Sequence, residues 1–151
     1  MKTMHAPAAA PAAPALEHAC TIVAEVAPGL PVERRGADML EIIPITGGTV
    51  TGRISGRVEP GGADWCRERA DGAYEVEARY WFRTDSGSVV DVVNVGRIAP
   101  GAPGERHGLF MSTPQFRTLD PELQWLTQRV FVGRAEAFGT HTTIDVFEVV
   151  S

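Results

Sequence analysis

The chain has 151 residues, and its 14 Lys and Arg against 19 Asp and Glu give a formal net charge of −5. This length suits one domain and is too short for two ordinary ones. The acidic balance argues against a nucleic-acid partner, and the lack of any run near 20 apolar residues argues against a membrane-spanning helix.

Residues 1–15 read MKTMHAPAAAPAAPA and are predicted to form a disordered leader before a folded domain at residues 16–151. Their Ala and Pro bury too little surface to offset the entropy lost on ordering. Three prolines also interrupt the apolar core that a secretory signal needs, so we expect a cytoplasmic protein. Lys2 is the only lysine in the chain. A lysine Schiff base or lysine general base inside the domain is therefore excluded.

From Leu16 onward, short apolar or alternating runs separated by Gly and Pro clusters predict an all-β domain. Eight strands are expected, at residues 20–26, 39–44, 49–58, 74–84, 88–98, 109–116, 129–137 and 142–150. A short helix is expected at residues 120–127, because Asp120 can cap it and Pro121 suits the first helical position. About eight to ten strands with one short helix fit a single compact antiparallel β-barrel, with a two-layer sandwich as the alternative.

Glycine occupies two alternate inward positions of the predicted strand 49–58, at Gly52 and Gly56. Glycine weakens a strand, so its presence there needs a reason. Sharp coiling of a small barrel is the favoured reason, and room for a ligand against that wall is the alternative.

The hairpin around Asp85-Ser86-Gly87 has the best-determined register. A three-residue loop of this kind needs a left-handed residue at its third position, and Gly87 supplies it. The loop pairs Thr84 with Ser88 and fixes every pair behind it. The pairs expected on the apolar face are Phe82–Val90, Tyr80–Val92, Ala78–Asn94, Val76–Gly96 and Tyr74–Ile98. A shift by one residue would mix charged and apolar side chains, so the pattern rejects it.

Several strings lie in the order typical of one family: PITGG at 44–48, PGGADW at 60–65, ARYWFRTDSG at 78–87, FMSTPQFRT at 110–118 and WLTQRVFV at 125–132. From Leu16 to Val150 the chain resembles the family called domain of unknown function 3237, also catalogued as uncharacterised protein family 0311. The resemblance implies a compact antiparallel β-barrel and brings no established reaction. The Ala/Pro leader and the short connection at residues 100–107 depart from the family pattern.

The PGGADW string contains the first candidate catalytic residue. Pro60-Gly61-Gly62 turns the chain, and Asp64 and Trp65 then face in opposite directions. If Asp64 points inward, an apolar surround raises its pKa and suits it to proton transfer. The alternative is that Asp64 caps the turn while Trp65 anchors the core.

Tyr80 and Asn94 share the apolar face of the hairpin, where they can orient a carbonyl or enolate oxygen. The alternative is a pair satisfied by each other, by backbone or by water. Further candidate ligand-binding residues, which core packing also explains, are Trp65, Phe82, Phe110, Thr113 (with Ser112 beside it), Phe116 and Trp125. Arg79 and Arg83 face outward, which favours a subunit interface or a solvated salt-bridge face over an anion site.

The histidines lack metal-ligand spacing, and no phosphate-binding or dinucleotide-binding motif is present, so neither a metal nor a cofactor is expected. Cys20 and Cys66 are expected to be reduced thiols. The favoured function is a barrel that binds a small apolar or aromatic molecule and acts as a cofactor-free isomerase, cyclase or lyase. The alternative is a non-catalytic ligand carrier or a homo-oligomeric interaction module with a filled barrel.

Overall fold

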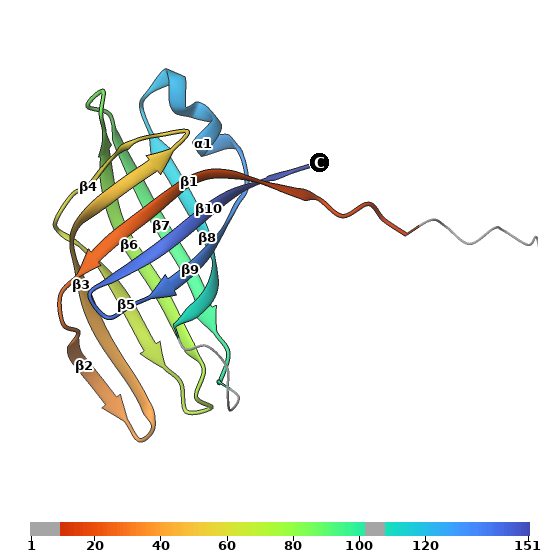
Figure 1. The fold of residues 1–151 in the computed structure, drawn as a ribbon. Helices are drawn as coiled ribbons and strands as arrows, with labels where there is room; N and C mark the ends of the chain where they lie inside the picture. Colours follow the sequence, from red (N-terminus) through yellow and green to blue (C-terminus); the bar gives the residue numbers. More distant parts are fainter. Residues whose placement is uncertain (1–9, 102–107) are drawn as a thin grey trace, which may run out of the picture.

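The computed structural model describes residues 10–101 and 108–151. Within these two ranges, ten strands form one antiparallel sheet that closes on itself (Figure 1). The strands are β1 (Ala15–Val26), β2 (Leu30–Arg35), β3 (Asp38–Gly52), β4 (Gly56–Val58), β5 (Gly62–Glu68), β6 (Tyr74–Thr84), β7 (Val89–Ile98), β8 (Leu109–Thr118), β9 (Phe131–Ala137) and β10 (His141–Val150). They occupy eight positions around the barrel, because β4 and β5 follow one another between β3 and β6 and β2 only flanks β3.

The barrel closes through β1, which pairs with β10 on one side and with β3 on the other. A short helical segment follows β8 and consists of η1 (Pro121–Leu123) and α1 (Gln124–Gln128). The Asp120 carboxylate caps it by accepting a hydrogen bond from the Glu122 N–H at 2.9 Å. The predicted β-barrel with one short helix is therefore confirmed.

The hairpin between β6 and β7 has the predicted register. Phe82 lies opposite Val90, and the pairing continues without a shift to Tyr74 opposite Ile98. The Thr84 N–H donates to the Ser88 carbonyl at 2.9 Å, and Gly87 adopts the left-handed conformation with φ 97°.

Two strands were not predicted, and one predicted strand is split. All six residues of β2 are exposed, so the strand lacks the alternation that reveals a half-buried strand. The predicted strand 49–58 is the end of β3 followed by β4, with a bend between them. A side chain at Gly52 would lie 2.8 Å from the Cys20 Cα, and one at Gly56 would overlap the Arg83 carbonyl. Glycine is therefore needed at both positions because neighbouring backbone packs against them, and neither position provides room for a ligand.

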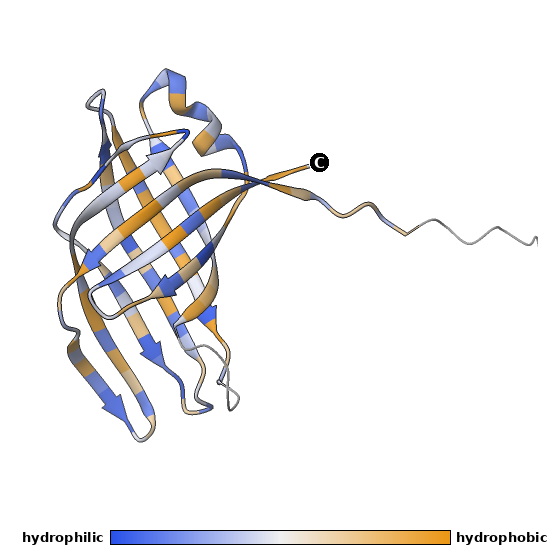
Figure 2. Cartoon of the chain, in the orientation of Figure 1, coloured by the Kyte–Doolittle hydropathy of each residue, from blue (hydrophilic) through white to orange (hydrophobic). Residues whose placement is uncertain are grey.

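The hydrophobic core lies inside the barrel and extends to its α1 end. Phe82, Ile22 and Leu126 are among the largest fully buried side chains. Leu126 belongs to α1, which covers the upper end of the barrel in Figure 1. Figure 2 shows hydrophobic and hydrophilic residues alternating along the strands, as expected for strands with one buried face. Within the described ranges, no helix has the length and apolar character needed to span a bilayer.

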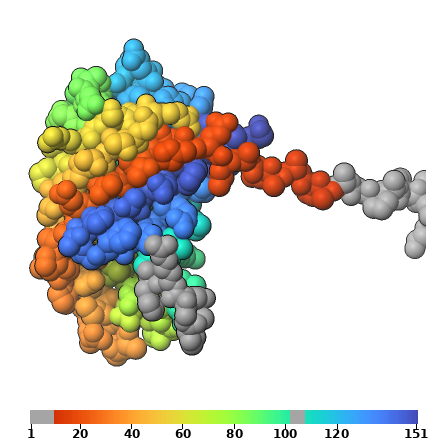
Figure 3. All heavy atoms as spheres, viewed as in Figure 1, coloured from red at the N-terminus to blue at the C-terminus, as the bar shows by residue number. Residues whose placement is uncertain are grey.

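The predicted leader falls largely on residues 1–9, which lie outside the described residues. Residues 10–14 are exposed, and β1 begins at Ala15, which lies opposite Val150 of β10. Figure 3 shows the chain leading into β1 as it extends away from the packed body, with β1 and β10 side by side on the face in view.

A buried carboxylate at the α1 end of the barrel provides a test of the packing. The Glu148 side chain is 4% exposed and lies 2.6 Å from Arg129 Nη1, with Arg53 Nη1 at 3.9 Å. Arg129→Ala leaves this carboxylate poorly compensated, so we expect a loss of about 3 kcal/mol in the free energy of unfolding, measured with urea. The exposed pair Arg35–Glu33 is the control, and Arg35→Ala should cost at most about 1 kcal/mol. Equal losses would contradict the burial of Glu148.

Candidate functional site

The break between β4 and β5 sets the position of Asp64. Gly61 has φ 115°, and a side chain there would lie 2.8 Å from the Trp81 ring. A side chain at Gly62 would overlap Tyr80, so glycine lets β5 approach β6 closely at this point. Strand β5 then runs with Asp64 opposite Ala78 of β6. Breaks of this kind in a strand re-aim the side chains that follow.

Asp64, Ala78 and Asn94 form one row across β5, β6 and β7. Because directly paired residues point to the same side, all three face the barrel interior. The small Ala78 side chain stands between the two polar ones and leaves space above the sheet. Tyr80, two residues along β6, borders the same space.

This space is a small cavity of about 40 Å³. Its polar lining consists of Asp64, Tyr80, Asn94 and Thr142. Its apolar lining consists of Ala24, Val26, Ile45, Val76, Ala78, Phe110 and Ile144. Such a volume holds a water molecule or two, or one functional group of a larger ligand.

Three polar atoms of the cavity residues are unsatisfied. Asp64 Oδ1, Tyr80 OH and Asn94 Oδ1 are buried and have no hydrogen-bond partner among the described residues. Tyr80 is 3% exposed and Asn94 is 6% exposed. Each unsatisfied buried group costs about 1–3 kcal/mol, so three at one cavity indicate a place for a ligand or ordered water.

Burial raises the pKa values of two of these residues, Asp64 and Tyr80. Burial, with a smaller contribution from the nearby Glu41 carboxylate, raises the pKa of Asp64 to about 6, while a hydrogen bond from the Glu77 backbone opposes the shift. Burial also raises the pKa of Tyr80 above its ordinary value, so the phenol stays neutral. Asp64 can therefore exchange a proton near neutral pH beside a neutral hydroxyl.

Neither cysteine has the low pKa that favours a catalytic nucleophile. Both are free thiols, and Cys20 is buried. Burial raises the pKa of each thiol to about 12, and the nearby Asp64 carboxylate adds to the shift at Cys66. Thiols with so high a pKa carry almost no thiolate at neutral pH. No group of three or more His, Cys, Asp or Glu in residues 10–101 and 108–151 has an arrangement suited to a metal ion.

Four of the nine predicted site residues line this cavity: Asp64, Tyr80, Asn94 and Phe110. Phe110 packs where a side chain at Gly96 would stand, at 3.0 Å. Ser112, which precedes Thr113, faces inward. Its Oγ is buried and has no hydrogen-bond partner among the described residues.

The other five predicted site residues are not part of the cavity lining. Trp65 lies on the outer face and is 39% exposed. Phe82 and Phe116 are buried in the core, where Phe116 packs edge-on against Phe131. Trp125 lies in α1 under the guanidinium of Arg53 at 5.0 Å.

Thr113 faces outward and donates a hydrogen bond to the Val95 carbonyl at 3.4 Å. The outward-facing Arg79 and Arg83 form ion pairs with Glu77 and Glu59, each at 3.3 Å. This part of the outer surface is a salt-bridge face within the chain itself.

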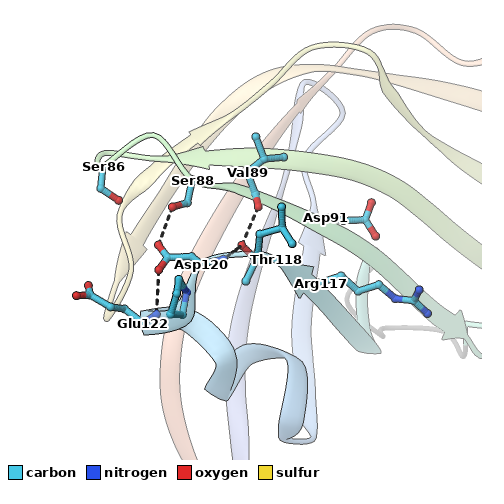
Figure 4. Close-up of a pocket in the computed structure, with 10 residues that line it drawn as sticks. Ser86, Ser88, Val89, Asp91, Arg117, Thr118, Asp120 and Glu122 are labelled. Atoms are coloured by element: carbon cyan, nitrogen blue, oxygen red, sulfur yellow. Dashed lines mark hydrogen bonds between the residues drawn. The ribbon is translucent and has the colours of Figure 1, made fainter.

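A larger groove of about 880 Å³ lies on the outer surface between the β6–β7 hairpin tip and η1 (Figure 4). Three of its polar residues already have hydrogen-bond partners. Ser88 Oγ donates to Asp120 at 2.6 Å, the same carboxylate caps η1, and Thr118 Oγ1 donates to the Val89 carbonyl at 2.9 Å. Asp91 and Arg117 of this groove are exposed to solvent, whereas the unsatisfied polar atoms of the interior cavity are buried, so the smaller cavity is the stronger candidate site.

The fold and the cavity define a small antiparallel β-barrel with a few polar groups in an apolar interior. A profile of the family described as "Protein of unknown function (DUF3237)" matches residues 14–149. A UPF0311 protein of Rhodopseudomonas palustris is 40% identical over 141 residues, covering 85% of this chain and 92% of that protein. A UPF0311 protein of Clostridium acetobutylicum is 31% identical over 121 residues, covering 72% and 77%. The chain belongs to this family.

Solved structures show the same fold. The crystal structure of a conserved protein of unknown function from Rhodopseudomonas palustris has a TM-score of 0.84 at 36% identity, covering 93% of this chain and 100% of that one. A structure described as an enzyme from Penicillium herquei has a TM-score of 0.77 at 20% identity, covering 94% and 98%. The second likeness is one of fold alone.

Proposed function

We propose that this protein binds a small apolar or aromatic molecule in the barrel and transforms it by cofactor-free acid–base chemistry, as an isomerase, cyclase or lyase. The observation that carries the proposal is the set of three unsatisfied polar atoms, Asp64 Oδ1, Tyr80 OH and Asn94 Oδ1, in one apolar-walled cavity. Pockets with a few convergent polar groups in an apolar wall are typical of small-molecule sites. A ligand that hydrogen-bonds to these atoms removes the penalty of leaving them unpaired.

In the proposed reaction, Asp64 moves the proton. Its carboxylate removes a proton from a carbon or hydroxyl of the substrate, and the resulting carboxylic acid returns the proton at the second reacting atom. The neutral Tyr80 hydroxyl donates a hydrogen bond to the substrate oxygen on which negative charge develops. Asn94 fixes the orientation of the same part of the molecule. The step leaves the protein unchanged, and it needs no electron acceptor or donor.

A second candidate function is supported by the small cavity volume. About 40 Å³ is far less than a whole aromatic ligand occupies, which favours a filled barrel that serves as a non-catalytic carrier or an oligomeric interaction module. In that case the polar atoms bind ordered water, and the exposed Trp65, Val95 and Met111 of the outer face are the surface of interest.

Turnover by an Asp64→Asn variant separates the two functions. Native mass spectrometry of freshly purified protein identifies a co-purifying compound, and its conversion is then followed by chromatography. We expect Asp64→Asn to lower the rate by about 10²–10⁴-fold, because a neutral amide cannot accept the proton. Glu77→Gln, on the outer face of β6, is the matched control and should retain the wild-type rate. A folded Asp64→Asn variant with full turnover contradicts the role of Asp64, and a compound that returns unchanged from the wild type supports a carrier.

A further inference from the structure

Two more carboxylates face the barrel interior beyond the cavity. Asp64, Cys66 and Glu68 occupy alternate positions of β5, so they point to the same side of the strand. Glu41 of β3 lies directly opposite Cys66 and shares that side. Tyr74 lies opposite Glu68 at the end of β6 that is far from α1 (Figure 1). A line of carboxylates thus runs from the cavity to the end of the barrel opposite α1.

The Glu41 side chain lies against the connection between β1 and β2. A side chain at Gly29 would lie 2.6 Å from Glu41 Oε2, so this carboxylate rests against the connection that follows β1. Val26, the last residue of β1, lines the cavity. The negative charge of Glu41 contributes to the raised pKa of Asp64, and Glu41 and Glu68 both contribute to the raised pKa of Cys66. Glu41 therefore acts electrostatically on Asp64 in the cavity, and Glu68 acts on Cys66, the next residue on the same side of β5.

The arginines near these carboxylates either lie on the outer face of the barrel or are exposed to solvent. Arg67 and Arg69 form ion pairs on the outer face, with Asp38 at 2.6 Å and with Asp71 at 2.8 Å. Arg34 lies opposite Met39, so it shares the side of Glu41, but it is exposed and its Nη2 donates to Met39 Sδ at 2.9 Å. Among the described residues, the inward side near the cavity therefore has negative charge in excess.

Two of the three unsatisfied atoms of the cavity favour a hydrogen-bond donor, whereas the third, Tyr80 OH, can itself donate. Asp64 Oδ1 and Asn94 Oδ1 are both hydrogen-bond acceptors, and Asn94 is 6% exposed. A group that binds between them must donate hydrogen bonds. A carboxylate or phosphate has only acceptors in its ionised form and would also be repelled by the three carboxylates.

We propose that Glu41 and Glu68 select the ligand by charge, so that the cavity takes a neutral or cationic molecule with hydrogen-bond donors and rejects carboxylates and phosphate esters. This inference rests on the proposed function, because it names the class of molecule that the same cavity binds. Glu41 and Glu68 are specificity-determining residues in this account, and neither takes part in the proton transfer.

Three probes of the same planar shape test the selection: benzamidine is a cation, benzamide is neutral and benzoate is an anion. Each is titrated into ¹⁵N-labelled full-length protein, and its dissociation constant is taken from chemical-shift changes at Ala78, Asn94 and Gly96. We expect benzamidine and benzamide to shift these signals and benzoate to bind at least about tenfold more weakly. In the double variant Glu41→Gln/Glu68→Gln, the ratio of the benzoate to the benzamidine dissociation constant should fall by about tenfold.

Glu77→Gln on the outer face removes the same kind of charge elsewhere and should leave the ratio unchanged. If the double variant fails to fold, each single variant should lower the ratio in part, and high salt should lower it in the wild-type protein. Benzoate that binds as tightly as benzamide, or a ratio unaffected by both glutamate substitutions, overturns the charge selection alone. A wild-type protein that binds none of the three probes at these residues contradicts the proposed small-molecule site itself.

Discussion

An Asp64→Asn variant is expected to be more stable than the wild-type protein at about pH 8, by about 1–3 kcal/mol in the free energy of unfolding. Burial raises the pKa of Asp64 from 3.8 to about 6, so the ionised carboxylate is less favourable in the folded chain than in the unfolded chain. Each pKa unit corresponds to about 1.4 kcal/mol, and the lower part of the range allows for solvent that reaches this half-buried residue. The asparagine amide has nearly the same shape and no charge. Urea unfolding of both proteins measures the difference.

The pH dependence of this difference follows from proton binding. Between about pH 4 and pH 6 the folded chain holds a proton at Asp64 that the unfolded chain has released, so this residue's contribution to stability falls as pH rises through that window. Above the window both states are ionised and the contribution is constant. The gap between Asp64→Asn and wild type should therefore be smallest below about pH 4 and largest above about pH 7. A gap that is the same at both ends contradicts the burial of this carboxylate.

Gly62→Ala is expected to destabilise the protein by about 2–3 kcal/mol and to disturb the cavity at the same time. The added methyl group would lie 2.6 Å from the Arg79 carbonyl oxygen and 2.7 Å from the Tyr80 Cα. Backbone atoms cannot turn away, so β5 must move relative to β6. Because Asp64 follows two residues later in β5, the same movement separates it from Tyr80.

Gly36→Ala is the matched control for this prediction. Gly36 has φ 60°, and no atom lies within 4 Å of the position of an added methyl group. Its cost is that of a left-handed alanine, about 1–2 kcal/mol, with no displacement of neighbouring strands. Thermal unfolding ranks the two variants, and amide shifts report any change at the cavity. A Gly62→Ala protein that is as stable as wild type, with unchanged signals at Ala78 and Asn94, contradicts the close approach of the two strands.

The parts of the fold that depend on local pattern could be predicted from the sequence. The Gly87 turn fixes the β6–β7 register because each later pair follows from the turn geometry. In contrast, β2 contains Pro31 and three charged residues and buries none of its side chains, so no periodicity reveals it. Strand β5 was not predicted because the Pro60-Gly61-Gly62 turn precedes it directly and indicated a loop. The turn is real, but the chain re-enters the sheet at Gly62.

The candidate site was partly predictable for the same reason. Tyr80 and Asn94 follow from the hairpin register, and Asp64 follows from its place after the turn, although its direction was left open. The far wall of the cavity comes from β1 and β10, where Ala24 and Ile144 contribute. Strand β1 contains two register shifts, near His18 and Glu25, and no local pattern indicates where such shifts fall. Glu41 was within a predicted strand, but its side could be assigned only once its partner β5 was known.

A crystal structure of the protein soaked with benzamidine tests most directly whether this cavity is a small-molecule site. We expect the amidinium group to enter between Asp64 Oδ1 and Asn94 Oδ1 and to donate a hydrogen bond to each, with the ring toward Phe110 and Val26. Ordered water that satisfies Asp64, Tyr80 and Asn94 together, with benzamidine bound elsewhere or absent at saturating concentration, would contradict it.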